Sequence, residues 1–211
     1  FALASILILS RMKETLPKAM KSRFSLSLFR IGWKDVFEPK VIPVFWVMLF
    51  VSFSAGAMIT LIPDTSKVVG WSNKGLYFTI YTVSSIVIRF FFSKASDQYG
   101  RIPVLIFGCF MLSISMFLLV FSANSYLLIA SAVIYGIAWG FNTPTLAAWT
   151  NDLGDTNHMG RAMATMYIAL EAGIGIGAYV SGEIYQGIPN HIPIPFLIAG
   201  LLSLLAFLLL W

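Results

Sequence analysis

Four charged side chains lie close together in a chain that is otherwise mostly apolar: Arg89, Lys94, Asp97 and Arg101. Long apolar runs precede and follow them. Because charge is costly in hydrocarbon, such a cluster must lie where a membrane meets water. Guanidinium and carboxylate groups attract one another there, so the chemistry expected at this place is charge pairing.

The residues beside Arg101 indicate how it is presented. Gly100 permits a tight turn that a Cβ atom would hinder, so Arg101 can open the following apolar segment. Its side chain is long enough to reach a carboxylate on the next loop at the same face. Asp152 and Asp155 are the two candidates, and the sequence leaves both open.

Glu171 is the acidic residue that lies well inside an apolar run, about ten residues from either end. An isolated ionised carboxylate in hydrocarbon costs several kcal/mol, so the group must be neutral, paired or facing a cavity. One interpretation is a carrier of protons or cations that is coupled to substrate movement. The other is a protonated glutamic acid that hydrogen-bonds a neighbouring helix.

Aromatic and polar residues also recur at helical spacing. Tyr135, Trp139 and Asn142 stand at i, i+4 and i+7, which places them on one face of a helix. We expect this face, with Tyr77 and Tyr81 of an earlier apolar run, to line a substrate cavity. The alternative for the tyrosines and the tryptophan is an aromatic belt at the membrane surface.

Small residues follow the same spacing around Glu171. Gly173 and Gly177 continue a stripe that includes Ala169 and Ser181. Such stripes let two helix backbones approach closely, so they predict helix packing.

The composition excludes a water-soluble domain. Of 211 residues, 58% are hydrophobic and 11% are charged, whereas a soluble domain carries roughly 25% charged residues. The net charge of +5 does not indicate a nucleic-acid partner, because eight of the fourteen Lys and Arg residues lie between Arg11 and Lys40 and the others border apolar runs.

Enzyme and metal chemistry find no support. Cys109 is the single cysteine, and His158 and His191 stand apart outside the apolar runs. The sequence contains no His-Glu-x-x-His, no Gly-x-Ser-x-Gly and no Gly-x-x-x-x-Gly-Lys-Ser/Thr. We therefore expect no metal, no cofactor and no catalytic residue.

Six apolar runs have the length of a membrane-spanning helix, about 20 residues. The predicted spans are residues 41–62, 75–92, 102–123, 126–150, 162–185 and 195–211. Residues 1–10 are interpreted as the end of a truncated transmembrane helix, and residues 11–40 as a basic linker. Part of that linker is either a helix lying on the membrane surface or a flexible segment. Both ends of the chain resemble cuts in a longer protein.

The loops give a predicted orientation. The basic linker, the loop with Lys94 and Arg101, and the loop with Arg161 all fall on one side of the six spans. The positive-inside rule places that side in the cytoplasm. The membrane expected to hold the protein is the plasma membrane.

Ser93-Lys-Ala-Ser-Asp97-Gln-Tyr-Gly100-Arg101-Ile resembles the loop signature of the major facilitator superfamily, Gly-x-Leu-Ala-Asp-Arg-x-Gly-Arg-Lys. Asp97, Gly100 and Arg101 match it. Ser93, Gln98 and Ile102 replace its first Gly, its first Arg and its final Lys, which is typical of the second copy of the signature. Arg89, eight residues before the Asp, also fits.

Two further segments resemble the same family in the expected order. Gly136-x-x-x-Gly140 with Asp152 is similar to its fourth or tenth helix, and Gly160-Arg161 to the start of its fifth or eleventh. The resemblance implies an all-α membrane protein whose six transmembrane helices form two inverted three-helix repeats, the C-terminal half of a transporter. Its partner is then a missing N-terminal six-helix half.

For function, the resemblance implies a secondary active transporter that moves a small molecule by alternating access, with protons as a candidate coupling ion and lipids around it. A non-transporting receptor or scaffold with the same architecture is the alternative. With no Arg or Lys deep in a span, neutral or cationic substrates are favoured. The resemblance also implies contacts that lock one conformation, or else a static clamp, formed by Arg89, Asp97, Gly100, Arg101, Asp152 and Arg161.

Overall fold

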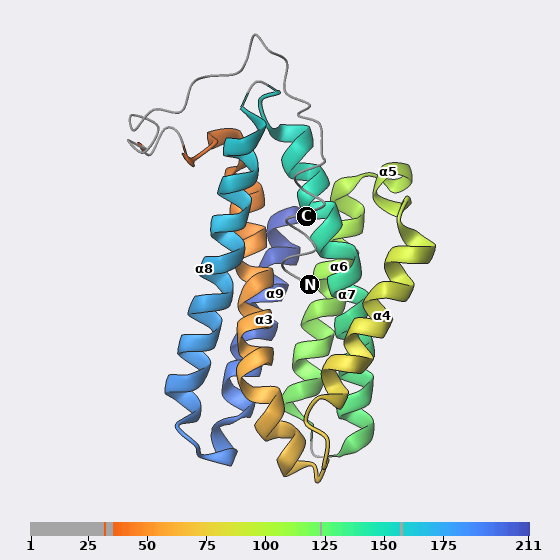
Figure 1. Cartoon of the computed structure of the whole chain (residues 1–211), viewed down its shortest axis with the longest axis vertical. Coiled ribbons are helices and arrows are strands. Elements are labelled where there is room, and N and C mark those ends of the chain that lie inside the picture. The colour runs from red at the N-terminus through yellow and green to blue at the C-terminus, as the bar shows by residue number, and fades with distance from the viewer. Residues whose placement is uncertain (1–31, 33–35, 123, 157) are drawn as a thin grey trace, which may run out of the picture. The chain divides into compact units, whose positions relative to one another are not determined.

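Seven α-helices account for most of the described part of the chain (Figure 1). The computed structural model describes residue 32 and residues 36–122, 124–156 and 158–211. The predicted truncated helix over residues 1–10 and nearly all of the predicted linker over 11–40 lie outside the described residues. In chain order the helices are α3 (Ile42–Val68), α4 (Leu76–Phe92), α5 (Ala95–Tyr99), α6 (Arg101–Val120), α7 (Ser125–Leu153), α8 (Met159–Tyr185) and α9 (Pro193–Leu210), with 3-10 turns at Pro39–Val41 and Pro189–His191.

Five segments that contain α3, α6, α7, α8 and α9 are long and apolar enough to cross a membrane. Besides these five segments, α4 is a shorter apolar helix of 17 residues. At 1.5 Å per residue it spans about 25 Å, somewhat less than a hydrocarbon core of roughly 30 Å. The chain is therefore an all-helical integral membrane protein, as its apolar runs predicted.

The helix α3 extends beyond the predicted end of the first span at residue 62 and continues through Pro63 to Val68. A proline removes one backbone hydrogen bond, but other bonds can carry the helix onward. Here the Thr65 hydroxyl donates to the carbonyl of Leu61 at 2.8 Å, and Lys67 pairs with Asp64 at 2.8 Å. Similarly, α7 passes through Pro144 and ends at Leu153 rather than at residue 150.

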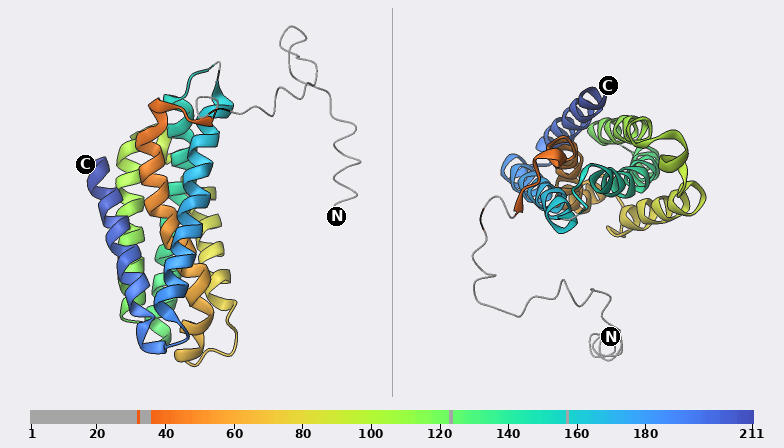
Figure 2. Two further views of the ribbon diagram at one scale, coloured as in Figure 1. Left: turned by 90° about the vertical axis from the view of Figure 1, so that its left-hand side faces the viewer. Right: turned by 90° about the horizontal axis from the view of Figure 1, so that it is seen from above.

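The helices pack as two related triplets. α3 packs on α8 and α9, α7 packs on α4 and α6, and α6 packs on α9. If α3, α4 and α6 are exchanged for α7, α8 and α9, the α3–α8 contact becomes α4–α7, the α3–α9 contact becomes α6–α7, and the α6–α9 contact is unchanged. Because a unit of three spans reverses direction across the membrane, this is the arrangement of inverted three-helix repeats (Figure 2).

Glycines permit the close approach in both of the equivalent helix pairs, α3–α8 and α4–α7. A Cβ atom at Gly177 of α8 would overlap the carbonyl oxygen of Phe53 in α3. A Cβ atom at Gly136 of α7 would likewise overlap the carbonyl oxygen of Tyr81 in α4. Backbones this close gain dispersion contacts along their whole length, which is the main source of helix association in lipid.

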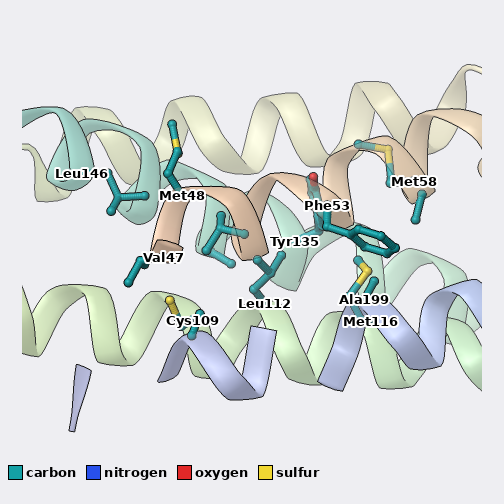
Figure 3. Close-up of a cluster of buried hydrophobic side chains, with 14 of the residues drawn as sticks. Val47, Met48, Phe53, Met58, Cys109, Leu112, Met116, Tyr135, Leu146 and Ala199 are labelled. Carbon is teal, nitrogen blue, oxygen red and sulfur yellow. The ribbon is translucent and has the colours of Figure 1, made fainter. Parts of the chain in front are cut away.

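The largest buried side chains gather where α3, α6, α7 and α9 meet (Figure 3). Met48 and Met58 of α3 and Met116 of α6 are almost completely buried. Unbranched methionine side chains fill irregular gaps between helices. This core fixes the ends of the helices, and those ends carry the charged groups considered next.

Candidate functional site

Gly100 connects α5 to α6 and positions Arg101. Its φ of +90° and ψ of 161° lie in a region that side chains with a Cβ rarely adopt. The turn makes Arg101 the first residue of α6, directed toward both α5 and the end of α7. The loop over residues 93–101 is thus more ordered than the sequence indicated, because it contains the short helix α5.

Arg101 holds three partners at once. Its Nε donates to Asp152 Oδ2 at 2.7 Å, and its Nη1 donates to Asp97 Oδ1 at 2.5 Å and to Ser96 Oγ at 2.8 Å. Of the two predicted candidates, Asp152 is the partner, whereas Asp155 Oδ2 lies 3.4 Å from His158 Nδ1. The guanidinium therefore ties the α4–α6 connection to the C-terminal turn of α7.

A second ion pair lies at the same end of the bundle and joins Arg161 to Glu38. Arg161 Nε donates to Glu38 Oε2 at 2.9 Å, and Nη2 donates to the same oxygen. The Glu38 backbone N–H donates to Thr165 Oγ1 at 2.9 Å, and the residue is only 3% exposed. The pair ties the start of α3 to the start of α8, across 123 positions of sequence.

Sequence reasoning missed Glu38. The available signal was its position, an acid directly before Pro39 and the first span, at the end of a strongly basic segment. We call the end of the bundle that carries Glu38, Arg101 and Arg161 the arginine-bearing end. Figure 1 shows the start of α3, α5 and the α7–α8 connection together at this end.

The two ion pairs differ in burial. The side chains of Arg101 and Asp152 are 23% and 49% exposed, whereas those of Arg161 and Glu38 are 26% and 4% exposed. Exposed pairs contribute roughly 0–1 kcal/mol, but removing one partner of a buried pair is far more costly. The Arg161–Glu38 pair is therefore the stronger of the two constraints.

Arg89 lies apart from both pairs. It is exposed and borders a cavity of about 210 Å³ between α4 and α7, together with Ser93 and Thr145. Its side chain has no hydrogen bond or ion pair with any residue that the structure describes. Its assignment to a locking contact stays a prediction.

Glu171 lies near the middle of α8 and is exposed. It is roughly 18 Å from the start of the helix and 21 Å from its end, at 1.5 Å per residue. Gly173 and Gly177 lie on the buried side, where α8 packs on α3, so the predicted small-residue stripe is used within this half. Glu171 shares the opposite, exposed side with Gly175 and Tyr179.

The tyrosines predicted to line a cavity form a row between α4 and α7. The Tyr77 hydroxyl lies 2.9 Å from Ser131 Oγ, and both side chains are buried. The Tyr81 and Tyr135 rings meet edge to face at 5.4 Å, and Tyr135 stacks on Trp139 at 5.9 Å. Their contacts hold α4 against α7; of the row, Tyr81 and Trp139 keep part of their surface.

Asn142 is fully buried on the same face of α7 as Tyr135, seven residues earlier, but it packs against α6. Its amide packs directly on Gly108 of α6, where a Cβ would lie 2.8 Å from the amide carbon. Neither polar atom of the amide has a hydrogen-bond partner among the described residues. In this half Asn142 thus faces a helix contact, and a role toward substrate stays a prediction.

In the described ranges no group of three His, Cys, Asp or Glu residues could hold a metal ion. His191 Nδ1 lies 3.0 Å from the carbonyl oxygen of Ile184, and the His158 ring is exposed beside Asp155. The groups that gather at the site are therefore paired charges and aromatic rings.

An all-helical membrane unit of two inverted triplets, clamped by arginines at one end, is the architecture of one half of a membrane transporter. The chain belongs to the Major Facilitator Superfamily, whose sequence profile matches residues 44–211.

Curated relatives agree with this assignment. The quinolone resistance protein NorA of Staphylococcus aureus (strain Mu50) is 25% identical over 173 residues, which is 81% of this chain and 44% of the relative. Multidrug resistance protein 2 of Bacillus subtilis (strain 168) is 24% identical over 177 residues, covering 82% of this chain and 44% of its own length. The chain thus spans a little less than half the length of these relatives and matches their C-terminal half.

Proposed function

We propose that this chain is the C-terminal half of a secondary active transporter in the plasma membrane, with the arginine-bearing end in the cytoplasm. Its partner is an N-terminal six-helix half, and the complete protein moves a small solute by alternating access. The relatives that carry drug-resistance names support a drug-like amphipathic solute and export as the direction.

The observation that carries the proposal is the exposed carboxylate of Glu171 at mid-span. An ionised group at this depth is too costly to leave against lipid, so the exposed side of α8 must face the other half or a water-filled cavity. There Glu171 can take up a proton or pair with a cationic solute. Competition between the two for one carboxylate couples solute export to proton entry.

The ion pairs at the arginine-bearing end supply the second element of the proposal. Each joins elements from different parts of the half, so each resists relative movement of the helix ends. If the transport cycle separates these ends, the pairs stabilise one conformation over the other by their own free energy and no more. The exposed Arg101–Asp152 pair is the one that opens at low cost.

The test uses the complete protein in proteoliposomes with an imposed pH gradient and a fluorescent quinolone. Glu171→Gln removes the titrating group at nearly constant side-chain shape. The control is Glu183→Gln, which makes the same change at an exposed site near the C-terminal end of α8. We expect gradient-driven accumulation to be lost in Glu171→Gln, while exchange of labelled for unlabelled quinolone continues. Glu183→Gln should transport as the parent protein does.

Unaltered gradient-driven transport in Glu171→Gln would remove Glu171 from the coupling role. A quinolone-dependent rise in Tm without any flux, in the parent protein, would instead favour a receptor with transporter architecture. A protein that exchanges the solute but ignores the pH gradient would retain transport and exclude proton coupling.

A further inference from the structure

A lateral groove of about 490 Å³ lies among α4, α6 and α7, directly below α5, and is separate from both ion pairs. Its walls are almost entirely carbon and include Ile88, Phe92, Phe107, Ile137 and Phe141. Because α4 and α6 both pack along α7 and are joined by α5, the groove is closed by α7 at its back and by α5 at its end (Figure 1).

The groove has the depth of the upper part of one lipid leaflet. It starts beside Tyr99 of α5 and reaches Phe107, six residues beyond Arg101, about 9 Å along α6. Its walls on α4 and α6 carry exposed aromatic side chains, with Phe92 53% and Phe107 45% exposed. Such surface suits hydrocarbon rather than water, so the expected occupant is an acyl chain.

A cationic recess adjoins the groove at the arginine-bearing end. It shares Phe92, Ala95 and Tyr99 with the groove and is also lined by Lys94 and Gln98. Within the described ranges the Lys94 ammonium group has no hydrogen bond or ion pair, whereas the neighbouring carboxylate of Asp97 is bound by Arg101. No described carboxylate therefore pairs with the lysine charge.

Arg89 adds a second positive charge at the same place. The cavity of about 210 Å³ that it borders shares Ile88, Phe92 and Phe141 with the groove. An apolar slot of leaflet depth thus ends at two cations that have no protein anion of their own in the described structure. A phospholipid with apolar acyl chains and a negative headgroup complements both the apolar slot and the two cations.

We propose that the groove binds one anionic phospholipid, with an acyl chain along Phe107 and Ile137 and the phosphate beside Lys94 and Gln98. The lipid fills the gap between α4 and α6 and neutralises the basic end of α4. It comes from the leaflet at the arginine-bearing end, because the headgroup and α5 lie at the same level.

The test measures lipid retained by the purified complete protein in native mass spectra, with dioleoyl phosphatidylglycerol and dioleoyl phosphatidylcholine at equal concentration. We expect phosphatidylglycerol to be retained preferentially. One lysine near an anionic headgroup contributes about 1 kcal/mol, so Lys94→Ala should weaken that binding about fivefold. Lys74→Ala, an equal charge change in the α3–α4 connection, should leave it unchanged.

Ile137→Phe fills the groove and should weaken phosphatidylglycerol binding at least tenfold, since a few methylenes lose their burial. Ile129→Phe is the matched control, two turns away on the same helix and 40% exposed. Size-exclusion chromatography confirms that each variant is folded, and Lys94→Ala, an exposed change, keeps the test valid if Ile137→Phe misfolds.

Equal retention of the two lipids by the parent protein would overturn the proposal. So would a loss in Lys94→Ala that Ile137→Phe does not share, because the lipid would then be held by surface charge alone. Displacement by millimolar inorganic phosphate would assign the recess to a free anion, and displacement by a quinolone would assign the groove to a solute. None of these readouts depends on transport.

Discussion

The Glu38–Arg161 pair offers the sharpest prediction, because its burial sets a magnitude. Changing Arg161 to Gln leaves the carboxylate of Glu38, 4% exposed, in a site without its charge partner. Breaking a fully buried pair costs roughly 3–5 kcal/mol, and the 26% exposure of the arginine lowers this to about 2–3 kcal/mol. Glu38→Gln in the same chain removes the stranded charge, so the double variant should regain at least half of the loss.

The matched cycle is Arg101→Gln with Asp152→Asn. The Arg101 and Asp152 side chains are 23% and 49% exposed, so the coupling free energy between them should stay below about 1 kcal/mol. Asp97 also remains bound to Arg101 when Asp152 is changed, which lowers the apparent coupling further. The two cycles together ask whether burial, rather than the presence of an ion pair, decides the contribution.

The assay is unfolding of the complete protein in mixed micelles as the mole fraction of dodecyl sulfate rises, followed by tryptophan fluorescence. The chain carries six tryptophans, so no added label is needed. A coupling free energy of about 2 kcal/mol for Glu38–Arg161 is the expected result. A value under about 0.5 kcal/mol, or one smaller than that of Arg101–Asp152, would refute the reasoning from burial.

Three further predictions concern packing. Gly177→Ala should lower the free energy of unfolding by about 1–3 kcal/mol, because its Cβ overlaps a carbonyl of α3. Gly175→Ala, with open space at the Cβ, should leave it unchanged, and equal losses in the two variants would contradict the contact. Gly108→Ala should destabilise the protein by a similar amount, about 1–3 kcal/mol, because the nearest atoms to its new methyl group belong to the Asn142 amide. Asn142→Ala in the same chain should restore stability, and the absence of rescue would place the strain elsewhere. Tyr77→Phe should cost about 1–2 kcal/mol in the dodecyl sulfate titration, because it removes a buried hydrogen bond of 2.9 Å to α7, and an unchanged midpoint would show that the bond does not form.

Much of the fold was predictable because its causes are local. Apolar length fixes the spans, and the charge at their ends fixes the connections, so α4, α8 and α9 begin or end within a few residues of the predicted bounds. The exception is α3, which continues beyond Pro63. A proline signals a missing hydrogen bond, but whether the helix continues depends on side chains such as Thr65 that rebuild the turn.

The site was predictable only where a motif specified both partners. Arg101 and Asp152 occur in recognisable segments, and their pairing follows. Glu38 lies 123 positions from Arg161, and no local pattern states that the two meet. The helix against which Asn142 packs was equally hidden, because a helical wheel gives relative angles between residues and not the direction of α6.

The most direct test of the account is the sidedness of two loops in intact cells. Lys74→Cys, between α3 and α4, and Gln98→Cys, in α5, are both exposed positions, and replacing the buried Cys109 by Ser removes the background. The account predicts that a membrane-impermeant maleimide labels position 74 from outside and reaches position 98 only after the membrane is opened. Labelling of both positions from outside would contradict six membrane crossings with a cytoplasmic arginine-bearing end.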